Sequence, residues 1–334
     1  MSTSRSVIVS ILNWNTAAMT AQCVESVLQL ERDEGVQLTV VVIDNGSADA
    51  DWALLQASIH SPEVELIREP RNLGFAGGHN VAIALALARN SDFIWLINSD
   101  SLLAPDAMRQ VLALMDADPR CGAASPVVTA LHDESKIDFC GARHDWKNLD
   151  SIRAGSVAQA RQMEADTPLE MWLAGTVVLF RIAALRAVGP LNAKLFAYFE
   201  DDDIGVRLVN GGWTNRIAFD ARAMHAQPDV KERPAHYFYL LYRNSFLFYL
   251  ANTPGPYRRW LRLRLLQRAL FTANRLIYKG QRDKANACML GVMDGLAGRG
   301  GVPNFQQRRA SLLMNMLRGI MLVKQYRWIK RLEG

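Results

Sequence analysis

Carboxylate and amide side chains stand directly after several apolar runs of this sequence. Val7–Leu12 is followed by Asn13 and Asn15. Thr39–Ile43 is followed by Asp44 and Asn45, and Phe93–Ile97 is followed by Asn98 and Asp100. The runs are short and rich in β-branched or aromatic residues, which is typical of strands buried on both faces. Open α/β sheets bind ligands at the carboxyl ends of their strands. We therefore expect these polar groups to converge on one crevice.

Asp100 has the chemistry of a metal ligand. Mg²⁺ and Mn²⁺ prefer carboxylate oxygens, and a divalent ion neutralises the charge on a departing diphosphate. A carboxylate at the end of a buried strand fits that task, and the alternative is a helix N-cap for the segment that follows. Asp44 also has two interpretations. Asp44-Asn45-Gly46 is a good turn sequence, and a carboxylate at this edge can accept hydrogen bonds from a base or a ribose.

Two further stretches can carry chemistry. The first, Asn72–Asn80, is glycine-rich and opens a helix, so its backbone N–H groups can cradle phosphate although its spacing is not GxGxxG. The second, Glu200–Asp203, has four acids in a row between apolar residues. Such a run is either a solvated acidic loop or a site where crowded carboxylates raise one another's pKa and one acts as general base. His225 is either a structural histidine or a metal ligand.

Strand and helix alternate in the first two thirds of the chain. This pattern predicts an α/β fold with a mostly parallel central sheet flanked by helices. Val64–Ile67 is a further expected strand, and the expected helices between the strands are Ala17–Leu30, Asp51–Ser58 and Asn80–Ala88. From about residue 120 to 230 the pattern is less regular, with an expected strand at Trp172–Phe180 and expected helices at Ile182–Val188 and Asp203–Asn210.

Net charge divides the chain unevenly. Residues 231–334 contain 20 Lys and Arg against 4 Asp and Glu, or +16; residues 1–230 contain 18 against 29, or −11, and together they give the formal net charge of +5. We expect two domains, 1–230 and 231–334, the second of them helical and basic. Its segment 260–280 reads as an amphipathic basic helix, which either packs as a solvated helix on the sheet domain or docks on an anionic membrane surface.

The bulk composition is that of a cytoplasmic globular protein. Half of the 334 residues are hydrophobic and about a fifth are charged. The four cysteines lie far apart and are expected to be reduced and mostly buried: Cys23, Cys121, Cys140 and Cys288. No window approaches the roughly 18 apolar residues of a membrane span. The apolar run near the N-terminus is too short for a signal peptide.

Taken in order, these motifs resemble the inverting family-2 glycosyltransferases of GT-A fold, and among them the bacterial rhamnosyltransferase branch. The resemblance covers about residues 5–225. Five motifs carry it: Leu12-Asn13-Trp14-Asn15, Val42-Ile43-Asp44-Asn45-Gly46-Ser47, Asn72 to Asn80, Ile97-Asn98-Ser99-Asp100, and Tyr198-Phe199-Glu200-Asp201-Asp202-Asp203-Ile204. Two positions depart from the family pattern. Asn98 replaces the first acid of the DxD motif, as in rhamnosyltransferase-like members, and His79 stands where relatives often have another residue.

The resemblance implies a role for each matched position. Asp201 would be the catalytic base, with Glu200 and Asp203 flanking it to orient acceptor and sugar. Asp100 would bind Mg²⁺ or Mn²⁺ on the diphosphate, with His225 as a further metal contact. The residues that would bind the nucleotide sugar are Asn13, Asn15, Asp44, Asn45, Asn72, Gly74, Phe75, Gly77, Gly78, Asn80, Asn98 and Gly175.

The implied reaction is a metal-assisted single displacement that inverts configuration at the anomeric carbon. The donor would be a nucleotide sugar, and the branch favours dTDP-L-rhamnose, although UDP- and GDP-sugars use the same scaffold. The acceptor would be a hydroxyl of a cell-surface glycan or of a polyprenyl-linked lipid at the inner face of the membrane. The oligomeric state is left open by the sequence.

Two other classes of function are open at this stage. A nucleotide-sugar pyrophosphorylase has a similar α/β core but would carry a glycine-rich loop with a basic residue after the first strand, where this chain has Asn13-Trp14-Asn15-Thr16. A non-catalytic protein would bind nucleic acid or anionic membrane through residues 231–334. The acidic front part of the chain would repel nucleic acid, so we expect no such partner.

Overall fold

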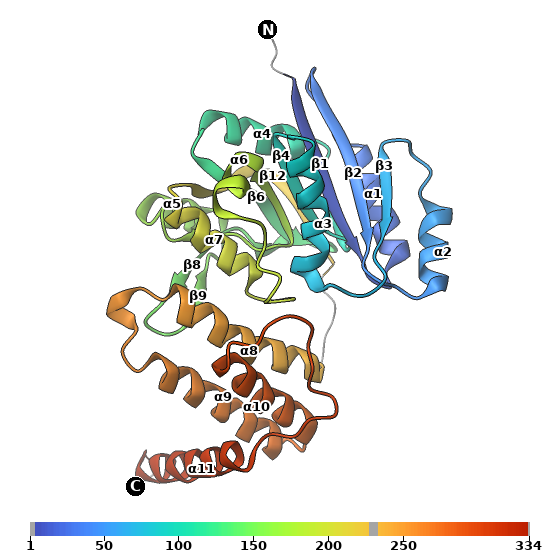
Figure 1. Cartoon of the computed structure of the whole chain (residues 1–334). Coiled ribbons are helices and arrows are strands. Elements are labelled where there is room, and N and C mark those ends of the chain that lie inside the picture. The colour runs from blue at the N-terminus through green and yellow to red at the C-terminus, as the bar shows by residue number, and fades with distance from the viewer. Residues whose placement is uncertain (1–3, 227–232, 333–334) are drawn as a thin grey trace. The chain divides into compact units, whose positions relative to one another are not determined.

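The computed structural model describes residues 4–226 and 233–332, with side chains described as far as residue 323. Within that range the chain forms two compact units (Figure 1). The first contains residues 4–145, 150–192 and 200–226, and the second contains residues 146–149, 193–199 and 233–332. The expected boundary between residues 230 and 231 lies outside the described residues.

One sheet forms the centre of the first unit. Nine of the described strands pair in it, in the order β3-β2-β1-β4-β11-β6-β12-β5 with β7 beside β6. Its parallel half consists of β1 (Arg5–Asn13), β2 (Val36–Asp44), β3 (Val64–Arg68) and β4 (Phe93–Asn98). The register pairs Asn13 with Asp44 and Leu12 with Asn98. The polar residues that end these strands therefore share one edge of the sheet.

The other half of the sheet mixes parallel and antiparallel pairs. Its strands are β5 (Ser101–Leu103), β6 (Cys121–Ala130), β7 (Asp133–Phe139), β11 (Val177–Arg181) and β12 (Thr214–His225). β11 runs antiparallel to β4 and β6, whereas β12 is parallel to β6 and antiparallel to β5. A separate three-stranded sheet consists of β10 (Met171–Trp172), β8 (Ala142–Asp145) and β9 (Asp150–Arg153).

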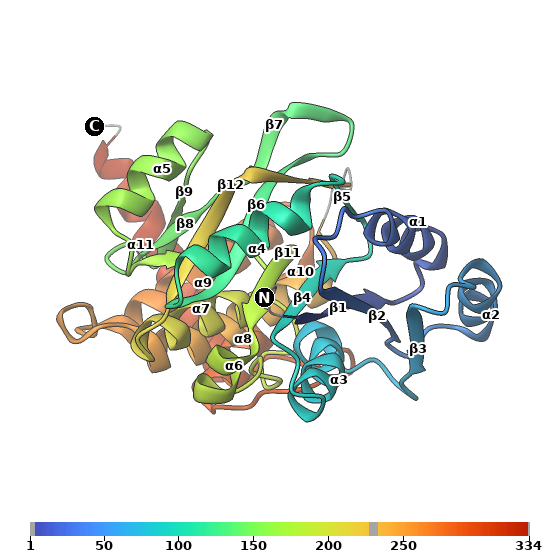
Figure 2. The ribbon, with the colours of Figure 1, turned by 90° about the horizontal axis from the view of Figure 1, so that it is seen from above.

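Helices cover both faces of the large sheet. Those of the first unit are α1 (Ala17–Leu28), α2 (Asp49–Ser58), α3 (Gly74–Ala88), α4 (Ala107–Ala117), α5 (Val157–Asp166), α6 (Ile182–Val188) and α7 (Glu200–Asn210). Figure 2 shows α1 and α4 on one face and α3 and α6 on the other. Because both faces are covered, the apolar runs of β1, β2 and β4 are almost entirely buried.

Three expected element bounds are wrong. The expected strand Trp172–Phe180 is two strands in different sheets, β10 and β11, because residues 173–176 leave the strand conformation between them. Helix α7 begins at Glu200 and not at Asp203, so the four acids form its first turn and are not a solvated loop. Helix α3 begins at Gly74 and not at Asn80, so most of the glycine-rich stretch is helical.

The second unit is built from helices. They are α8 (Ala235–Asn252), α9 (Leu261–Tyr278), α10 (Arg282–Leu296) and α11 (Leu312–Leu332), with a 3₁₀ turn at Gly255–Tyr257. Glycines let α10 lie directly on α8, since a Cβ on Gly291 would come within 2.3 Å of the Tyr239 carbonyl oxygen. A Cβ on Gly295 would come within 2.7 Å of the Arg243 carbonyl oxygen.

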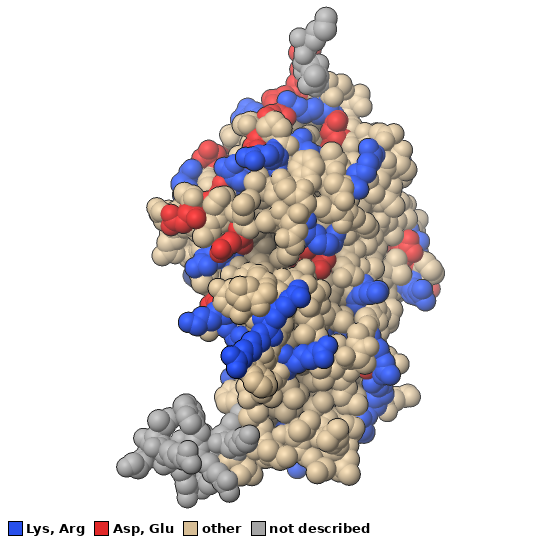
Figure 3. Space-filling model, turned by 60° about the vertical axis from the view of Figure 1, so that its left-hand side comes forward, with Lys and Arg blue, Asp and Glu red and all other residues tan. Residues whose placement is uncertain are grey.

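The surface of these helices is basic. On the face drawn in Figure 3, Lys and Arg side chains gather over the helical unit with few acidic side chains between them. None of the helices in the described ranges combines the length and the apolarity that a membrane crossing requires. The four cysteines, which lie in both units, are free and buried, as expected.

Candidate active site

Asn13, at the end of β1, ties three elements together by its side-chain amide. The amide nitrogen donates to Asp44 Oδ1 at 3.0 Å and to Asp51 Oδ2 at 2.9 Å, and the amide oxygen accepts the Thr20 hydroxyl at 2.7 Å. The side chain is fully buried. All of its described hydrogen bonds are thus made within the protein. Asn13 therefore positions Asp44, and its expected contact with the nucleotide stays a prediction.

Asp44 ends β2 as expected, but its side chain points inward. It is fully buried, and its Oδ2 lies 3.3 Å from Arg68 Nε. Arg68 also donates to Asp49 at 2.7 Å, which fixes the guanidinium beside the strand end. Asp44 Oδ2 has no hydrogen-bond partner in the described part of the chain. Its contact with Arg68 is an ion pair in this buried position.

Asparagines shape the loop that leads into α3. Asn45 donates to the Gly74 carbonyl at 3.1 Å and accepts the Leu73 N–H at 2.9 Å. Asn72 Oδ1 accepts the Gly74 N–H at 2.7 Å. Asn45 and Asn72 therefore hold the loop in shape. Their expected contact with the nucleotide stays a prediction.

Glycines in the same region allow close packing. Gly46 has φ +73°, and a Cβ there would lie 2.5 Å from the Arg71 carbonyl carbon. A Cβ on Gly78 would lie 2.3 Å from Leu12 Cδ1, and one on Gly77 would lie 2.8 Å from Leu73 Cβ. Side chains do not fit at these positions. Gly77 and Gly78 thus bring α3 close against β1 and the loop, which is a packing role.

Two more residues of the expected set, Asn80 and Asn15, make hydrogen bonds within the protein, as does His79. Asn80 exchanges two hydrogen bonds with the Leu191 backbone, at 2.8 and 3.0 Å, and so fixes the segment after α6. Asn15 Oδ1 accepts the Ala48 N–H at 2.9 Å. His79 is fully buried and its Nδ1 lies 2.8 Å from the Ser10 hydroxyl. Burial lowers the pKa of His79 to about 3, so this imidazole is a neutral core group.

Phe75, Gly175 and Asp201 come together from three distant parts of the chain. The Gly175 N–H donates to Asp201 Oδ2 at 3.1 Å. A Cβ on Gly175 would lie 3.1 Å from Phe75 Cζ and 3.7 Å from Asp201 Cβ. Asp201 Oδ1 accepts the N–H of Asp202 at 3.0 Å. The structure thus unites these expected site residues and presents Asp201 as a partly exposed carboxylate beside an aromatic ring.

The other three acids of this run face different surroundings. Burial, and then the charge of Asp201, raise the pKa of the Glu200 carboxyl well above its usual range. The same two causes raise the pKa of Asp202, whose Oδ1 lies 3.6 Å from Nδ1 of His144. Asp203 accepts a 2.7 Å hydrogen bond from Arg207 Nε. Glu200 is thus buried and Asp203 holds Arg207, and the expected roles of these two acids beside the acceptor stay predictions.

Asp100 and His225 meet at the end of the sheet. The pairing of β12 with β5 sets His225 opposite Ser101, and His225 Nε2 lies 3.3 Å from Asp100 Oδ1. On the other side of the ring, Nδ1 lies 2.8 Å from Asp138 Oδ2. Burial opposes the charged imidazole, but the hydrogen bonds with Asp100 and Asp138 outweigh it and raise the pKa of His225 to about 9.

A short path of backbone contacts links this pair to the acid run. The Asn98 N–H, at the end of β4, donates to the Thr176 carbonyl at 2.9 Å. Thr176 follows Gly175, whose N–H holds Asp201. Asp100 comes two residues after Asn98, so Asp100 and Asp201 lie at the same end of the sheet. The spacing of two sequence regions 100 residues apart is fixed here by hydrogen bonds.

Asp138 is a functional candidate that the sequence did not reveal. It lies on β7, a strand of mixed polar residues that no periodicity predicted, and it contacts the imidazole nitrogen opposite Asp100. A carboxylate in that position fixes the orientation of a metal-binding histidine. The only sequence signal is the presence of an acid near an apolar residue pair, which is too common to be informative.

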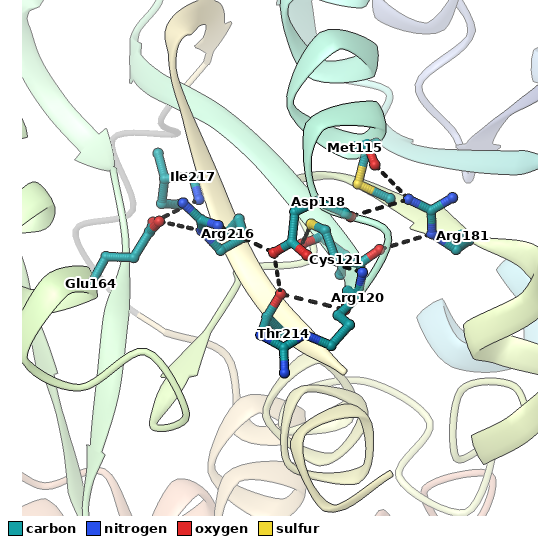
Figure 4. A network of polar contacts seen from close by, with 10 residues as sticks. Met115, Asp118, Arg120, Cys121, Glu164, Arg181, Thr214, Arg216 and Ile217 are labelled. Atoms are coloured by element: carbon teal, nitrogen blue, oxygen red, sulfur yellow. Dashed lines mark hydrogen bonds and ion pairs between the residues drawn. The ribbon is translucent and has the colours of Figure 1, made fainter. Parts of the chain in front are cut away.

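A second polar cluster lies away from these strand ends and holds elements together (Figure 4). Arg216, near the start of β12, contacts Glu164 of α5 and, at 3.2 Å, Asp118 after α4. Arg181 donates to the Met115 carbonyl at 2.6 Å. The cluster borders a cavity of about 720 Å³. Its charges are paired with one another, which indicates a structural network.

Comparison with known proteins identifies relatives. The sequence signature of the family described as "Glycosyltransferase like family 2" matches residues 4–245. The N-acetylglucosaminyl-diphospho-decaprenol L-rhamnosyltransferase of Mycobacterium tuberculosis is 25% identical, covering 77% of this chain and 89% of its own. The galactofuranosyltransferase GlfT1 of the same organism is 28% identical, over 56% of this chain and 60% of its own.

Solved structures agree on the fold. A mannosyltransferase from Pyrobaculum calidifontis, PcManGT in complex with GDP-Man and Mn²⁺, has a TM-score of 0.54 at 16% identity, covering 87% of this chain and 86% of that one. TarS 1–349 of S. aureus in complex with UDP-GlcNAc has a TM-score of 0.57 at 14% identity, covering 88% and 81%. The expected GT-A fold is confirmed.

Proposed function

This chain belongs to the glycosyltransferase-like family 2 and is a glycosyltransferase, and we propose that it transfers L-rhamnose from dTDP-L-rhamnose to a lipid-linked or cell-surface glycan. The family removes the two other classes, a pyrophosphorylase and a non-catalytic binding protein. The choice of sugar and acceptor is supported by the mycobacterial relative, whose name gives an L-rhamnosyl group and an N-acetylglucosaminyl-diphospho-decaprenol. The acceptor of this chain is then a hydroxyl on such a polyprenyl-linked sugar.

One observation carries the assignment of the catalytic base. Asp201 is held by the Gly175 N–H next to Phe75, at the sheet end that also bears Asp100. Burial and the charge of Asp201 raise the pKa of Glu200 and of Asp202, which disfavours the charged form of these two carboxyls. Asp203 is paired with Arg207. Asp201 is the acid of this run left to take a proton.

In the proposed reaction, Asp201 takes the proton of the acceptor hydroxyl. The acceptor oxygen forms a bond to the anomeric carbon while the bond from that carbon to the diphosphate oxygen breaks, and the electron pair leaves with the diphosphate. Attack from the opposite face inverts the configuration. The hydrogen bond from the Gly175 N–H holds the base in position before the reaction, which lowers the barrier to proton transfer.

Asp100 and His225 would hold the divalent ion. Their donor atoms suit it, since Mg²⁺ and Mn²⁺ bind carboxylate oxygen and Mn²⁺ also accepts the nitrogen of an imidazole that has released its proton. Within the described residues, no three His, Cys, Asp or Glu side chains gather to hold an ion by themselves. That agrees with a cation bound mainly through the phosphates of a substrate, which needs one or two protein ligands. When bound, the ion would neutralise charge on the departing diphosphate.

The test is a panel of dTDP-, UDP- and GDP-sugars with Mg²⁺ or Mn²⁺. We expect dTDP-L-rhamnose to raise the melting temperature most, to be hydrolysed slowly, and to rhamnosylate a synthetic N-acetylglucosaminyl-diphospho-prenol. Metal chelation should abolish the donor effect. Stabilisation and transfer with a UDP- or GDP-sugar alone would show that the proposed donor is wrong. A response to no nucleotide sugar would contradict the site assignment itself.

A further inference from the structure

The segment before α7 has an unusual backbone. Phe196, Tyr198 and Phe199 have φ values of 66°, 70° and 71°, in the left-handed region that bulky side chains rarely adopt. None of the residues 193–199 is a glycine. Phe199 directly precedes Glu200, the first residue of α7, so these dihedral angles set how the chain enters the helix that bears Asp201.

Asn244, in the middle of α8, donates hydrogen bonds to backbone carbonyl groups of this segment. Its side-chain nitrogen lies 2.7 Å from the Leu195 oxygen, 2.8 Å from the Ala197 oxygen and 2.8 Å from the Tyr198 oxygen. Asn244 is fully buried. A single amide therefore gathers three carbonyls of a four-residue stretch, which an extended chain cannot present to one donor.

Arg243 adds a second set of contacts from the same turn of α8. Its guanidinium donates to the Leu195 carbonyl at 2.9 Å and to the Gly301 carbonyl at 2.6 Å, and its Nε donates to Asn244 Oδ1 at 2.9 Å. The side chain is 1% exposed, and burial lowers the pKa of Arg243. A buried charge is costly unless it is well hydrogen-bonded. Here it is satisfied largely by backbone carbonyls of the segment and its neighbours.

Aromatic packing on α8 completes the arrangement. The Phe199 ring lies 5.4 Å from that of Phe248 and 6.0 Å from that of Tyr249. The Tyr198 ring meets that of Tyr237 edge to face at 5.2 Å. The two polar residues that interrupt the apolar sequence of α8 and the rings on either side of them thus contact the same short segment.

We propose that Arg243 and Asn244 are positioning residues for Asp201. They hold residues 193–199 in a conformation that the chain would not keep alone, and this segment leads directly into Glu200, the first residue of α7. The inference rests on the proposed role of Asp201 as base. It gives α8 a part in catalysis, in agreement with a family match that ends at residue 245, one residue past Asn244. Neither residue touches the reacting atoms.

The test compares Asn244→Ala with Asn252→Ala in the full-length protein. Asn252 lies on the same helix, and its amide donates to the Phe248 carbonyl at 3.1 Å, within α8. We expect Asn244→Ala to lower kcat at least about tenfold, since small displacements of a catalytic group are costly, while the Kd for the nucleotide sugar changes less than about twofold. Amide hydrogen exchange of residues 195–202 should rise. Asn252→Ala should leave all three measurements unchanged.

Several outcomes would overturn the proposal. They are a kcat of Asn244→Ala within twofold of the unmodified enzyme, an equal loss of kcat in both variants, or unchanged exchange in residues 195–202. If Asn244→Ala does not fold, Asn244→Ser keeps one donor and takes its place, with a smaller loss expected. If the unmodified protein transfers no sugar, the proposed function fails, and the exchange measurement alone decides whether Asn244 holds the segment.

Discussion

Four adjacent acids of α7 end up in four different surroundings because successive residues of a helix point in different directions, with about 3.6 residues per turn. Glu200 points into the protein, Asp202 toward His144, and Asp203 toward Arg207. Asp201 alone meets the Gly175 N–H. The clustering of charge in sequence therefore overstates the clustering in space, and the division of roles follows from helix geometry.

Replacing Asp201 by Asn tests the base directly. The amide keeps the size of the side chain but cannot take a proton, so kcat should fall by about 10²- to 10⁴-fold. The Kd for the donor should stay within about twofold, because the nucleotide does not need this proton acceptor. Steady-state transfer and calorimetric donor binding measure the two quantities. Transfer at the unmodified rate would show that another group is the base.

Asp203→Asn separates structure from chemistry in the same turn. The change weakens the 2.7 Å contact with Arg207, which in turn holds the Val188 carbonyl at 2.8 Å. We expect the free energy of unfolding to fall by about 1 to 3 kcal/mol, with less than about a tenfold loss of kcat. Urea unfolding and transfer assays decide. A loss of kcat as large as that of Asp201→Asn, without loss of stability, would restore Asp203 to the catalytic set.

Asp138 should matter for metal binding without contacting the ion. Because it holds His225 from the side opposite Asp100, Asp138→Ala should weaken Mn²⁺ binding in the presence of nucleotide by about 10- to 100-fold. Electron paramagnetic resonance of free Mn²⁺ measures this without turnover. The control is Asp133→Ala on the same strand, whose carboxylate contacts Ser135 and Lys136. Equal Mn²⁺ affinity in the two variants would argue against a positioning role.

At the scale of elements, the close contact between the β2 turn and the loop before α3 depends on Gly46. Gly46→Ala has two costs. It forces a residue with a side chain into the left-handed backbone conformation of Gly46, and it places a Cβ 2.5 Å from the Arg71 backbone. Gly212→Ala has only the backbone cost: Gly212 is also left-handed, with φ +83°, but an added Cβ would meet nothing within 4 Å. We expect the free energy of unfolding to fall by about 3 kcal/mol or more in Gly46→Ala and by about 1 to 2 kcal/mol in Gly212→Ala. Urea unfolding measures both values. Equal losses in the two variants would mean that the loop before α3 moves to make room for the added Cβ.

The packing of α3 on β1 buries a neutral histidine, and this has a consequence for pH. His79 has a folded pKa of about 3 against an ordinary value of 6.5. Above pH 6.5 His79 is neutral in both the folded and the unfolded chain, so it does not change the free energy of unfolding. As the pH falls below 6.5, His79 binds a proton in the unfolded chain but not in the folded one, so the free energy of unfolding falls. By pH 4.5 the loss is about 2 to 3 kcal/mol. His79→Gln should flatten the unfolding free energy over pH 4.5–7, and an unchanged slope would contradict this.

The elements also show what could be predicted from the sequence and what could not. The strands β1 to β4 were predicted because strands covered on both faces are continuous apolar runs. β7 and β12 were not, since they carry charged residues such as Lys136 and Arg222, and their strand conformation comes from their neighbours. Sequence thus located the polar sheet edge, but not Asp138. Nor could it show that the amides of Asn13 and Asn80 make hydrogen bonds inside the protein.

At the scale of the whole molecule, the division of charge has a structural counterpart in α9. Its exposed aromatic residues are Phe271 and Tyr278, which are 52% and 92% exposed, and Trp260, directly before the helix, is 64% exposed. Arg262 and Arg275 of the helix, and Arg259 before it, are also exposed. Aromatic and basic side chains that share the surface of one helix are typical of helices that lie on anionic membranes. We infer that α9 brings the enzyme to the inner membrane face, where a polyprenyl-linked acceptor would be found.

Removing charge from α9 should therefore reduce membrane binding and spare the reaction in solution. Changing Arg259, Arg262 and Arg275 together to Gln removes about 1 kcal/mol of attraction per residue, or about 100-fold in binding to vesicles with anionic phosphatidylglycerol. Co-sedimentation measures it, and high salt should weaken the unmodified protein similarly. The control changes Arg109, Arg120 and Lys136, exposed on the first unit, to Gln. Because the two triple variants have the same net charge, equal loss of binding in both would mean that total charge, and not the surface of α9, attracts this enzyme to lipid.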